Sequence, residues 1–260
     1  MTDIAISNVL QAEDRVPSQG WGMAALPLCR PWAEIVRAVL YLLFSMWCVA
    51  LLYVFLRLRI PSIRAMGGAT LSSPGPYVSG AMMLAVQLIT IGLVIARGRY
   101  LGGGDLVVGL AAGPNRRPWA LALVSIAQLA VSGFIGAYYW TGEGQQRQVI
   151  AAMADDPVFL IGSIVCVVVL APISEELFFR GWLWTALRRS WGVWPTALCT
   201  TGAWLALHGF DIARLVKLLP LAVVICIVRH YTGTVRATIA IHAANNAMAM
   251  ILAMVLFLFA

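Results

Sequence analysis

The stretch Pro172-Ile-Ser-Glu175-Glu176-Leu-Phe-Phe-Arg180-Gly-Trp-Leu-Trp184 places two adjacent carboxylates and an arginine in one of the most apolar regions of the chain. Charges in such surroundings are costly and need partners. If Pro172 ends one helix and the serine two residues later caps the next, Glu176 and Arg180 stand four residues apart and can pair. Glu175 points about 100° away on the same helix, so that arginine does not hold it. The pattern predicts one paired carboxylate and one that is available for chemistry.

The composition of the chain is that of a membrane protein. Of its 260 residues, 61% are hydrophobic and 11% are charged, whereas about 25% of a soluble domain is charged. The net charge of +7 comes largely from arginines at the ends of apolar runs, which indicates anchoring at anionic head groups of the lipid bilayer and not nucleic-acid binding. The five cysteines show no C-x-x-C spacing and are typical of small core residues.

The apolar runs predict an all-α fold, a polytopic bundle of seven or eight transmembrane helices. The run that leads into the quoted stretch is predicted as either one kinked span or two shorter helices. We expect residues 1–30 to form a cytoplasmic tail and residues 31–260 a single membrane-embedded domain, with a motif-bearing core at 158–260. The predicted segments are 32–56, 77–96, 119–140, 158–189, 193–207, 212–228 and 237–260.

The loops predict the orientation of the bundle. Arginine excess marks the cytoplasmic side, and loop 141–157 is the least positive, so it is predicted to lie outside. The N-terminus and loop 97–118 then lie inside, whereas loop 57–76 lies outside despite its three arginines. The glycine-rich part of loop 97–118 lacks the Gly-Lys-Ser/Thr of a phosphate-binding loop and is expected to be a connection. The expected location is the inner (plasma) membrane of a bacterium.

Two further polar motifs lie in apolar runs of the second half. Trp204-Leu-Ala-Leu-His208 ends one run, and Ile241-His242-Ala-Ala-Asn245-Asn246 lies inside the last one. His242 and Asn246 are four residues apart and share one helical face. Each motif alone also fits a surface ion pair, an interfacial histidine or hydrogen bonds between helices. Together they supply the parts of a hydrolase, and we expect the strongly polar buried groups to be concentrated in this half of the chain.

In this order, Glu-Glu-x-x-x-Arg, aromatic-x-x-x-His and His-x-x-x-Asn resemble the CAAX prenyl endopeptidase and bacteriocin-processing (CPBP, or Abi) family of intramembrane proteases. The resemblance covers residues 158–260. Trp204 stands where the family commonly has phenylalanine, which we expect to affect the shape of the pocket and not the chemistry. The resemblance implies a catalytic Glu175, the structural companions Glu176 and Arg180, the second-motif histidine His208, and the third-motif pair His242 and Asn246.

The predicted function is an intramembrane endopeptidase that acts on a membrane-associated peptide or protein. In this hypothesis Glu175 and His208 polarise the attacking water, and His242 and Asn246 donate hydrogen bonds to the oxyanion. No cofactor is required. The alternative is a zinc site in which Glu175, His208 and His242 are the ligands, although the chain has no H-E-x-x-H motif.

Two other classes of protein are compatible with the same residues. One is a non-catalytic member of the family, acting as a membrane scaffold or a bacteriocin-immunity protein; the retention of every motif residue favours an active enzyme instead. The other is a proton-coupled transporter, which should place polar residues in broken helices of both halves. The sequence does not indicate the substrate, the cleavage site or the oligomeric state.

Simple counting along the helices conflicts with the motifs. At about 1.5 Å per residue from the inner-side arginines, Glu175 and His208 lie roughly 20 Å deep, whereas His242 lies only about 10 Å deep. The motifs predict that these side chains meet. A helix break at a proline would reconcile the two predictions, and the candidate break points are Pro172, Pro195 and Pro220.

Overall fold

The computed structural model describes residues 30–61, 75–100, 118–140 and 144–259, and every regular element within them is a helix. The predicted tail at 1–30 and the glycine-rich loop lie almost entirely outside the described residues. Pro157–Arg188 form one continuous helix, which we call the motif helix. In chain order the elements are α2 (Pro31–Arg59), α4 (Pro76–Tyr100), α5 (Pro118–Tyr138), α6 (Gly144–Asp155), the motif helix with its parts α7 (Pro157–Ile164), η3 (Val165–Leu170), α8 (Ala171–Glu175), η4 (Glu176–Leu183) and α9 (Trp184–Arg188), then α10 (Val193–Leu207), α11 (Ile212–Thr232) and α12 (Val235–Phe259).

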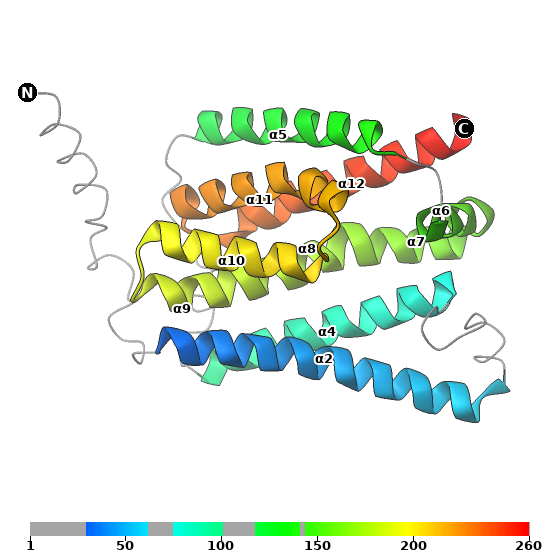
Figure 1. The fold of residues 1–260 in the computed structure, drawn as a ribbon, viewed down its shortest axis with the longest axis horizontal. Coiled ribbons are helices and arrows are strands. Elements are labelled where there is room, and N and C mark those ends of the chain that lie inside the picture. The colour runs from blue at the N-terminus through cyan, green and yellow to red at the C-terminus, as the bar shows by residue number, and fades with distance from the viewer. Residues whose placement is uncertain (1–29, 62–74, 101–117, 141–143, 260) are drawn as a thin grey trace, which may run out of the picture.

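With the motif helix counted once, the described residues hold eight helices, which confirms the predicted number and fold class. Five of them have the length and composition of a membrane span, the motif helix among them. Seven helices run back and forth along the long axis of the molecule (Figure 1). The eighth, α6, lies in a segment that was predicted as a loop.

Local sequence signals mark the helix ends. A proline begins each of α2, α4, α5 and α7, where its fixed φ and missing N–H suit the first turn. The Asp156 carboxylate caps the motif helix by accepting the N–H groups of Val158 and Phe159 at 2.8 and 3.3 Å. These two donors hold the pKa of Asp156 below its usual value. Gly233, with φ of 66°, ends α11 in the left-handed conformation.

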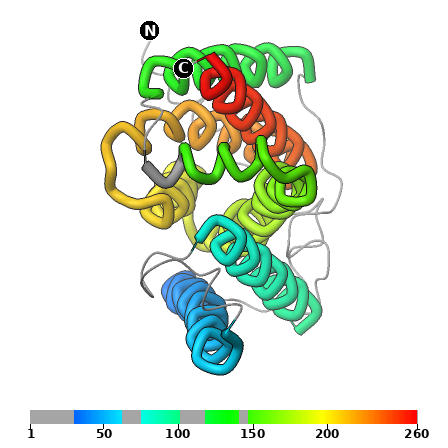
Figure 2. The backbone as a smooth tube through the Cα atoms, turned by 90° about the vertical axis from the view of Figure 1, so that its right-hand side faces the viewer, coloured from blue at the N-terminus to red at the C-terminus, as the bar shows by residue number. Residues whose placement is uncertain are grey.

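The motif helix lies in the middle of the bundle. Figure 2 shows α2 and α4 as a pair on one side of it, and α11, α12 and α5 stacked on the other. Its η4 segment is completely buried and forms the centre of the hydrophobic core with side chains from α10 and α11. The side chains at this centre include Phe178, Phe179, Trp182, Leu183, Trp204, Leu221 and Ile225.

Of the two predicted alternatives, one span and not two shorter helices is correct, because the motif helix continues through Pro172. Proline lacks an N–H and its ring collides with the carbonyl four residues earlier in an α-helix. The preceding η3 segment is wound as a π-helix, and Ala171 N–H donates to the carbonyl of Cys166, five residues back. The Ser174 hydroxyl does not cap a new helix; it donates to the carbonyl of Ala171 at 3.0 Å. The wider winding lets one span carry the whole motif.

The other two candidate break points also leave their helices intact. Pro195 lies in the first turn of α10, and Pro220 lies inside α11, which continues to Thr232. However, the 15 residues of α10 cover only about 22 Å, less than the roughly 30 Å of a bilayer core. The turn from α10 to α11 therefore lies within the length of the bundle and not at its end (Figure 1).

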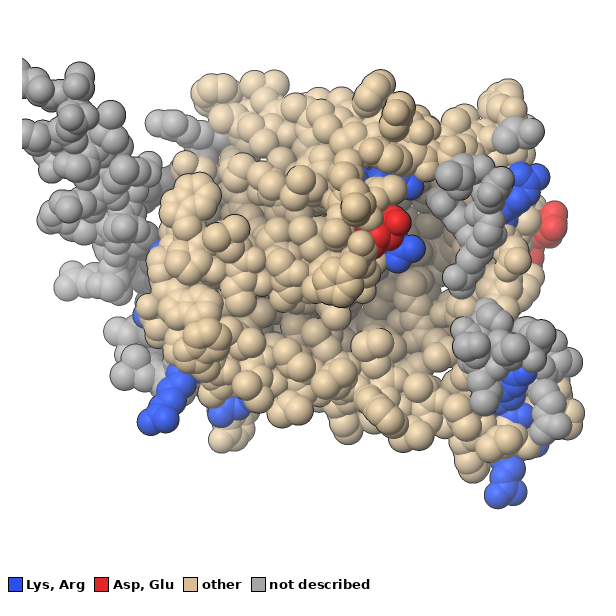
Figure 3. Space-filling model, viewed as in Figure 1, with Lys and Arg blue, Asp and Glu red and all other residues tan. Residues whose placement is uncertain are grey.

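The surface of the bundle is apolar over most of its length. In Figure 3 the blue atoms of lysine and arginine gather mainly toward the two ends of the molecule, and a hollow with charged atoms beside it lies between them. This distribution is the one expected of a bundle whose middle faces hydrocarbon.

Candidate active site

The ion pair predicted within the first motif is formed. Arg180 Nη1 lies 3.2 Å from Glu176 Oε1, and both side chains are completely buried. The guanidinium lies over the Trp204 ring, 5.1 Å from its centroid. A charge in this position is tolerated because it has an opposite charge and a polarisable ring face beside it. Glu176 and Arg180 are thus fixed parts of the core.

Glu175 has a different environment from its neighbour. Its side chain is 27% exposed, against 0% for Glu176. Trp204 Nε1 donates a hydrogen bond of 2.5 Å to Glu175 Oε2. One oxygen of this carboxylate is therefore held in place while the side chain remains accessible, as the sequence pattern predicts for the first glutamate of the motif.

His242 lies between the two carboxylates. Its Nδ1 is 3.1 Å from Glu176 Oε1, and its Nε2 is 3.9 Å from Glu175 Oε2. An ionised carboxylate only accepts hydrogen bonds, so Nδ1 is the donor to Glu176. The Glu176–Arg180 pair thereby fixes the orientation of the imidazole, and the opposite ring nitrogen faces the accessible carboxylate.

His208 joins the site through Trp204. Its Nδ1 lies 2.9 Å from the Trp204 carbonyl, and the two rings are 4.5 Å apart between centroids. A carbonyl cannot donate, so Nδ1 carries the hydrogen, and Nε2 is the basic nitrogen of the neutral ring. The Trp204 ring also packs edge-on against His242 at 5.7 Å. The residues of the three motifs therefore meet around Trp204.

Asn246 lies one helical turn beyond His242 and contacts the motif helix. Its Nδ2 donates to the carbonyl of Val167 at 2.9 Å. In the π-helical winding of η3 this carbonyl is opposite residue 172, which is a proline without an N–H. The asparagine replaces the missing main-chain donor. One of its two amide hydrogens remains for another acceptor.

The conflict over depth came from the assumption that all inner helix ends lie at one level. Arg229, near the end of α11, donates to the carbonyl of Arg180 at 2.7 Å and to the Thr185 hydroxyl at 3.2 Å. The turn from α11 to α12 consequently lies deeper in the bundle than the end of the motif helix. Because α12 starts from this deeper level, His242 reaches Glu175 although few residues precede it.

A second buried charge cluster lies in the first half of the chain, and the sequence analysis missed it. Glu34 is completely buried. It accepts hydrogen bonds from Arg97 Nη2 at 2.8 Å and from Trp182 Nε1 at 2.9 Å, and it pairs with Arg37. The prediction that the strongly polar buried groups lie in the second half is therefore wrong. The available signal was a glutamate in the first turn of an apolar span with an arginine three residues on.

A second missed contact joins α5 to the last motif. Gln128 Nε2 donates to Asn245 Oδ1 and to Ser132 Oγ, each at 2.8 Å. Asn245 therefore has a partner in the first half of the chain, although the sequence alone gives no reason to pair two polar residues so far apart.

The zinc alternative stays a prediction. Among the described residues no three His, Cys, Asp or Glu side chains are grouped closely enough to hold a metal ion. One ring nitrogen of His242 is bonded to Glu176 and one of His208 to the Trp204 carbonyl, so the Nε2 of each ring is the nitrogen that would bind a metal.

Long apolar helices with a polar cluster between them define an integral membrane protein. Residues 157–248 match the family described as type II CAAX prenyl endopeptidase Rce1-like. This match confirms the resemblance that the three motifs predict, and it supports a CAAX-protease-like peptidase in general. No curated protein and no solved structure matches the chain.

Proposed function

We propose that this protein is an intramembrane endopeptidase that hydrolyses a peptide bond of a membrane-associated protein or peptide. The observation that carries the proposal is the contrast between the two glutamates. Glu176 is completely buried with Arg180, whereas Glu175 is accessible and faces His242. A structural ion pair would explain the burial of Glu176 but not the accessible position of Glu175.

Glu175 and His208 are the groups proposed to activate water. Oε2 of Glu175 is held by Trp204, which leaves Oε1 to accept a hydrogen from a water molecule. The Nε2 of His208 carries the lone pair of the neutral ring and can take up a proton beside the Trp204 indole, against which the ring packs. A base within hydrogen-bond reach of the attacking water contributes about 10²- to 10⁴-fold to such reactions.

His242 and Asn246 are the groups proposed to stabilise the oxyanion. With Nδ1 donating to Glu176, Nε2 is the nitrogen that faces Glu175, and in this proposal it carries the hydrogen that is donated to the oxyanion. The amide hydrogen of Asn246 that is not bonded to Val167 supplies a second donor. Each donor that is aimed at the developing charge is typically worth about 3–4 kcal/mol.

The first test is cleavage of a farnesylated peptide by the purified protein in lipid nanodiscs. The family description suggests a peptide with a prenylated cysteine near its C-terminus as the first probe. We expect Glu175→Gln and His208→Ala each to reduce the cleavage rate by about 100-fold or more. The matched control is His230→Ala, at the end of α11, which should cleave at the wild-type rate. Equal cleavage by all four proteins would contradict the proposal.

Metal dependence is tested in the same assay. Incubation with a zinc chelator followed by its removal should leave the cleavage rate unchanged, because the site residues are held by one another and by Trp204. Loss of activity on chelation, with recovery on adding zinc and not magnesium, would contradict metal-independent chemistry and restore the ligand set of Glu175, His208 and His242.

A further inference from the structure

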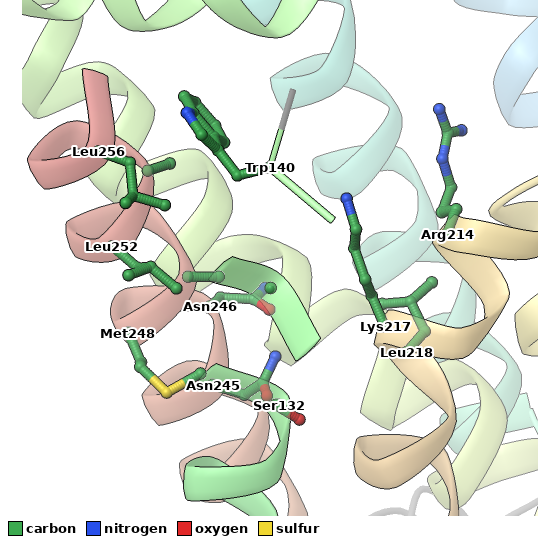
Figure 4. A pocket seen from close by; sticks show the side chains of 13 residues that line it. Ser132, Trp140, Arg214, Lys217, Leu218, Asn245, Asn246, Met248, Leu252 and Leu256 are labelled. Atoms are coloured by element: carbon green, nitrogen blue, oxygen red, sulfur yellow. The ribbon is translucent and has the colours of Figure 1, made fainter. Parts of the chain in front are cut away.

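A cavity between α5, α11 and α12 combines an apolar wall with two cations. Its volume is about 210 Å³, smaller than the roughly 300–1,000 Å³ of pockets for drug-sized ligands. In Figure 4, Arg214, Lys217 and Leu218 extend from α11 on one side, and the side chains of α12 face them from the other. The wall on α12 is made by Asn245, Asn246, Met248, Ala249, Leu252, Ala253 and Leu256.

The two cations line the cavity without an acidic side chain among the residues that line it. Arg214 Nη1 donates to the carbonyl of His208 at 2.9 Å, and Lys217 Nζ to that of Tyr139 at 3.3 Å. Asp211 is nearby, but its carboxylate accepts the main-chain N–H of Arg214 and caps α11. Both side chains are thus held and oriented by neutral carbonyls, and among the described residues neither forms an ion pair.

The position of these cations makes their charge costly. They lie on the first two turns of α11, just after the turn at which the short helix α10 ends within the length of the bundle (Figure 1). Positive charges at such a depth are rare unless they face a partner or a polar cavity. Trp140 also lines this cavity, and its buried indole N–H has no partner among the described residues.

We propose that this cavity binds the anionic head group of a membrane amphiphile, a carboxylate or a phosphate, whose apolar chain lies along α12. Arg214 and Lys217 supply the donors for the head group. Leu252, Leu256 and their neighbours supply the surface for the first part of the chain. The proposal goes beyond peptide hydrolysis and does not depend on it.

The test measures binding by native mass spectrometry of the protein in a neutral detergent. The anionic probes are oleic acid and dioleoyl phosphatidylglycerol, and their matched partners are oleyl alcohol and dioleoyl phosphatidylcholine. We expect at least one anionic probe to bind wild type about tenfold or more tightly than its partner. The two arms distinguish a carboxylate from a phosphate head group, and a preference in either arm supports the site.

Matched variants connect the preference to this cavity. Arg214→Gln/Lys217→Gln should abolish it, whereas Arg59→Gln/Arg147→Gln, which removes the same charge elsewhere at this end of the molecule, should retain it. Ala253→Phe keeps both cations but fills the cavity, and it should also abolish binding. Lys217→Arg should retain binding, which shows that substitution at this position leaves a folded protein.

Two results would overturn the site. One is equal affinity of wild type for each anionic probe and its partner. The other is an equal loss of preference in both double variants, which would mean general attraction to the basic surface. Either result leaves the peptidase proposal untouched, because that proposal is tested by cleavage and gives no role to Arg214, Lys217 or Ala253.

Discussion

Trp204 is the residue at which the three motifs meet, and its indole N–H is absent from the phenylalanine common at this position. The exchange was expected to change the shape of the pocket and not the chemistry. The 2.5 Å hydrogen bond from the Trp204 indole to Glu175 shows that the exchange also affects the accessible carboxylate. Hydrogen bonds to charged groups contribute about 1.5–3 kcal/mol, enough to fix the direction of a carboxylate that nothing else holds as closely.

Replacement of Trp204 by phenylalanine tests this contact. We expect Trp204→Phe to lower the cleavage rate about tenfold or more, because Glu175 loses the donor that orients it. Trp184→Phe removes the same volume from a buried tryptophan of the motif helix and serves as the control. Both variants should lose similar thermal stability, but only the first should lose activity. Equal activity would mean that Trp204 acts through packing alone.

The sequence indicates which residues come together at the candidate site because each of them combines a strong polar group with an apolar run. Glu175, His208 and His242 are conspicuous for that reason. Their contacts are less predictable, since the donor that holds Glu175 is an indole and Trp204 is unremarkable in an aromatic-rich membrane helix. The sequence analysis missed Glu34 because a glutamate near a helix start is typical of an interfacial charge. Its burial depends on Arg97 and Trp182, which are far away in the chain.

At the scale of the elements, Glu34 joins α2, α4 and the motif helix through one carboxylate. Glu34→Ala would leave Arg97, which is 8% exposed, without its partner. Breaking a buried pair in this way typically costs about 3–5 kcal/mol, so we expect a large fall in the free energy of unfolding, measured in detergent micelles.

Two variants provide the comparison for Glu34. Glu34→Gln retains an acceptor for the Trp182 N–H and should cost less than Glu34→Ala. Arg37→Ala removes a partner whose side chain is 44% exposed, and exposed pairs contribute only about 0–1 kcal/mol. A loss for Arg37→Ala as large as that for Glu34→Ala would contradict the central role of the carboxylate.

The π-helical winding of η3 leads to a second prediction at this scale. Asn246→Leu removes the donor to the Val167 carbonyl and should destabilise the protein by about 1–3 kcal/mol, the cost of an unsatisfied buried acceptor. Pro172→Ala restores a main-chain N–H opposite that carbonyl. The loss caused by Asn246→Leu should therefore be smaller in the Pro172→Ala background. An equal loss in both backgrounds, measured by unfolding in detergent, would mean that Asn246 does not replace the missing donor.

The helices could be predicted from the sequence because long apolar runs bounded by proline and arginine leave few alternatives in a bilayer. The winding inside the motif helix could not. Pro172 signals a disturbance, but an end, a kink and a π-helical segment are all ways to accommodate a proline. The π-helical winding depends on Asn246, which lies about 75 residues later on another helix. Its amide replaces the missing main-chain donor.

For the molecule as a whole, the basic residues distinguish the two ends of the bundle. The end at which α2 begins has one acidic residue in its described helix ends, Glu34 in the first turn of α2, whereas Asp155, Asp156 and Asp211 lie toward the other. The basic residues near the first end are Arg30, Arg97, Arg99, Arg188, Arg189, Arg229 and Arg236, and those toward the second are Arg57, Arg59, Arg147, Arg214 and Lys217. The positive-inside rule counts basic residues, and the larger number is at the first end.

We therefore expect the start of α2 to face the cytoplasm and the end of α12 to face the opposite side. Arg57 and Arg59 weaken the bias, but Arg57 donates to the Tyr53 hydroxyl and Arg59 lies over the Phe55 ring, so both side chains fold back along α2.

Fusions of a cytoplasm-active and a periplasm-active reporter to the C-terminus of the full chain measure the orientation in a bacterial host. We expect activity only from the periplasmic reporter, and Arg188→Glu/Arg189→Glu should reduce it by weakening the bias. Activity only from the cytoplasmic reporter would reverse the orientation, and the hollow beside the α10–α11 turn would then open toward the cytoplasm.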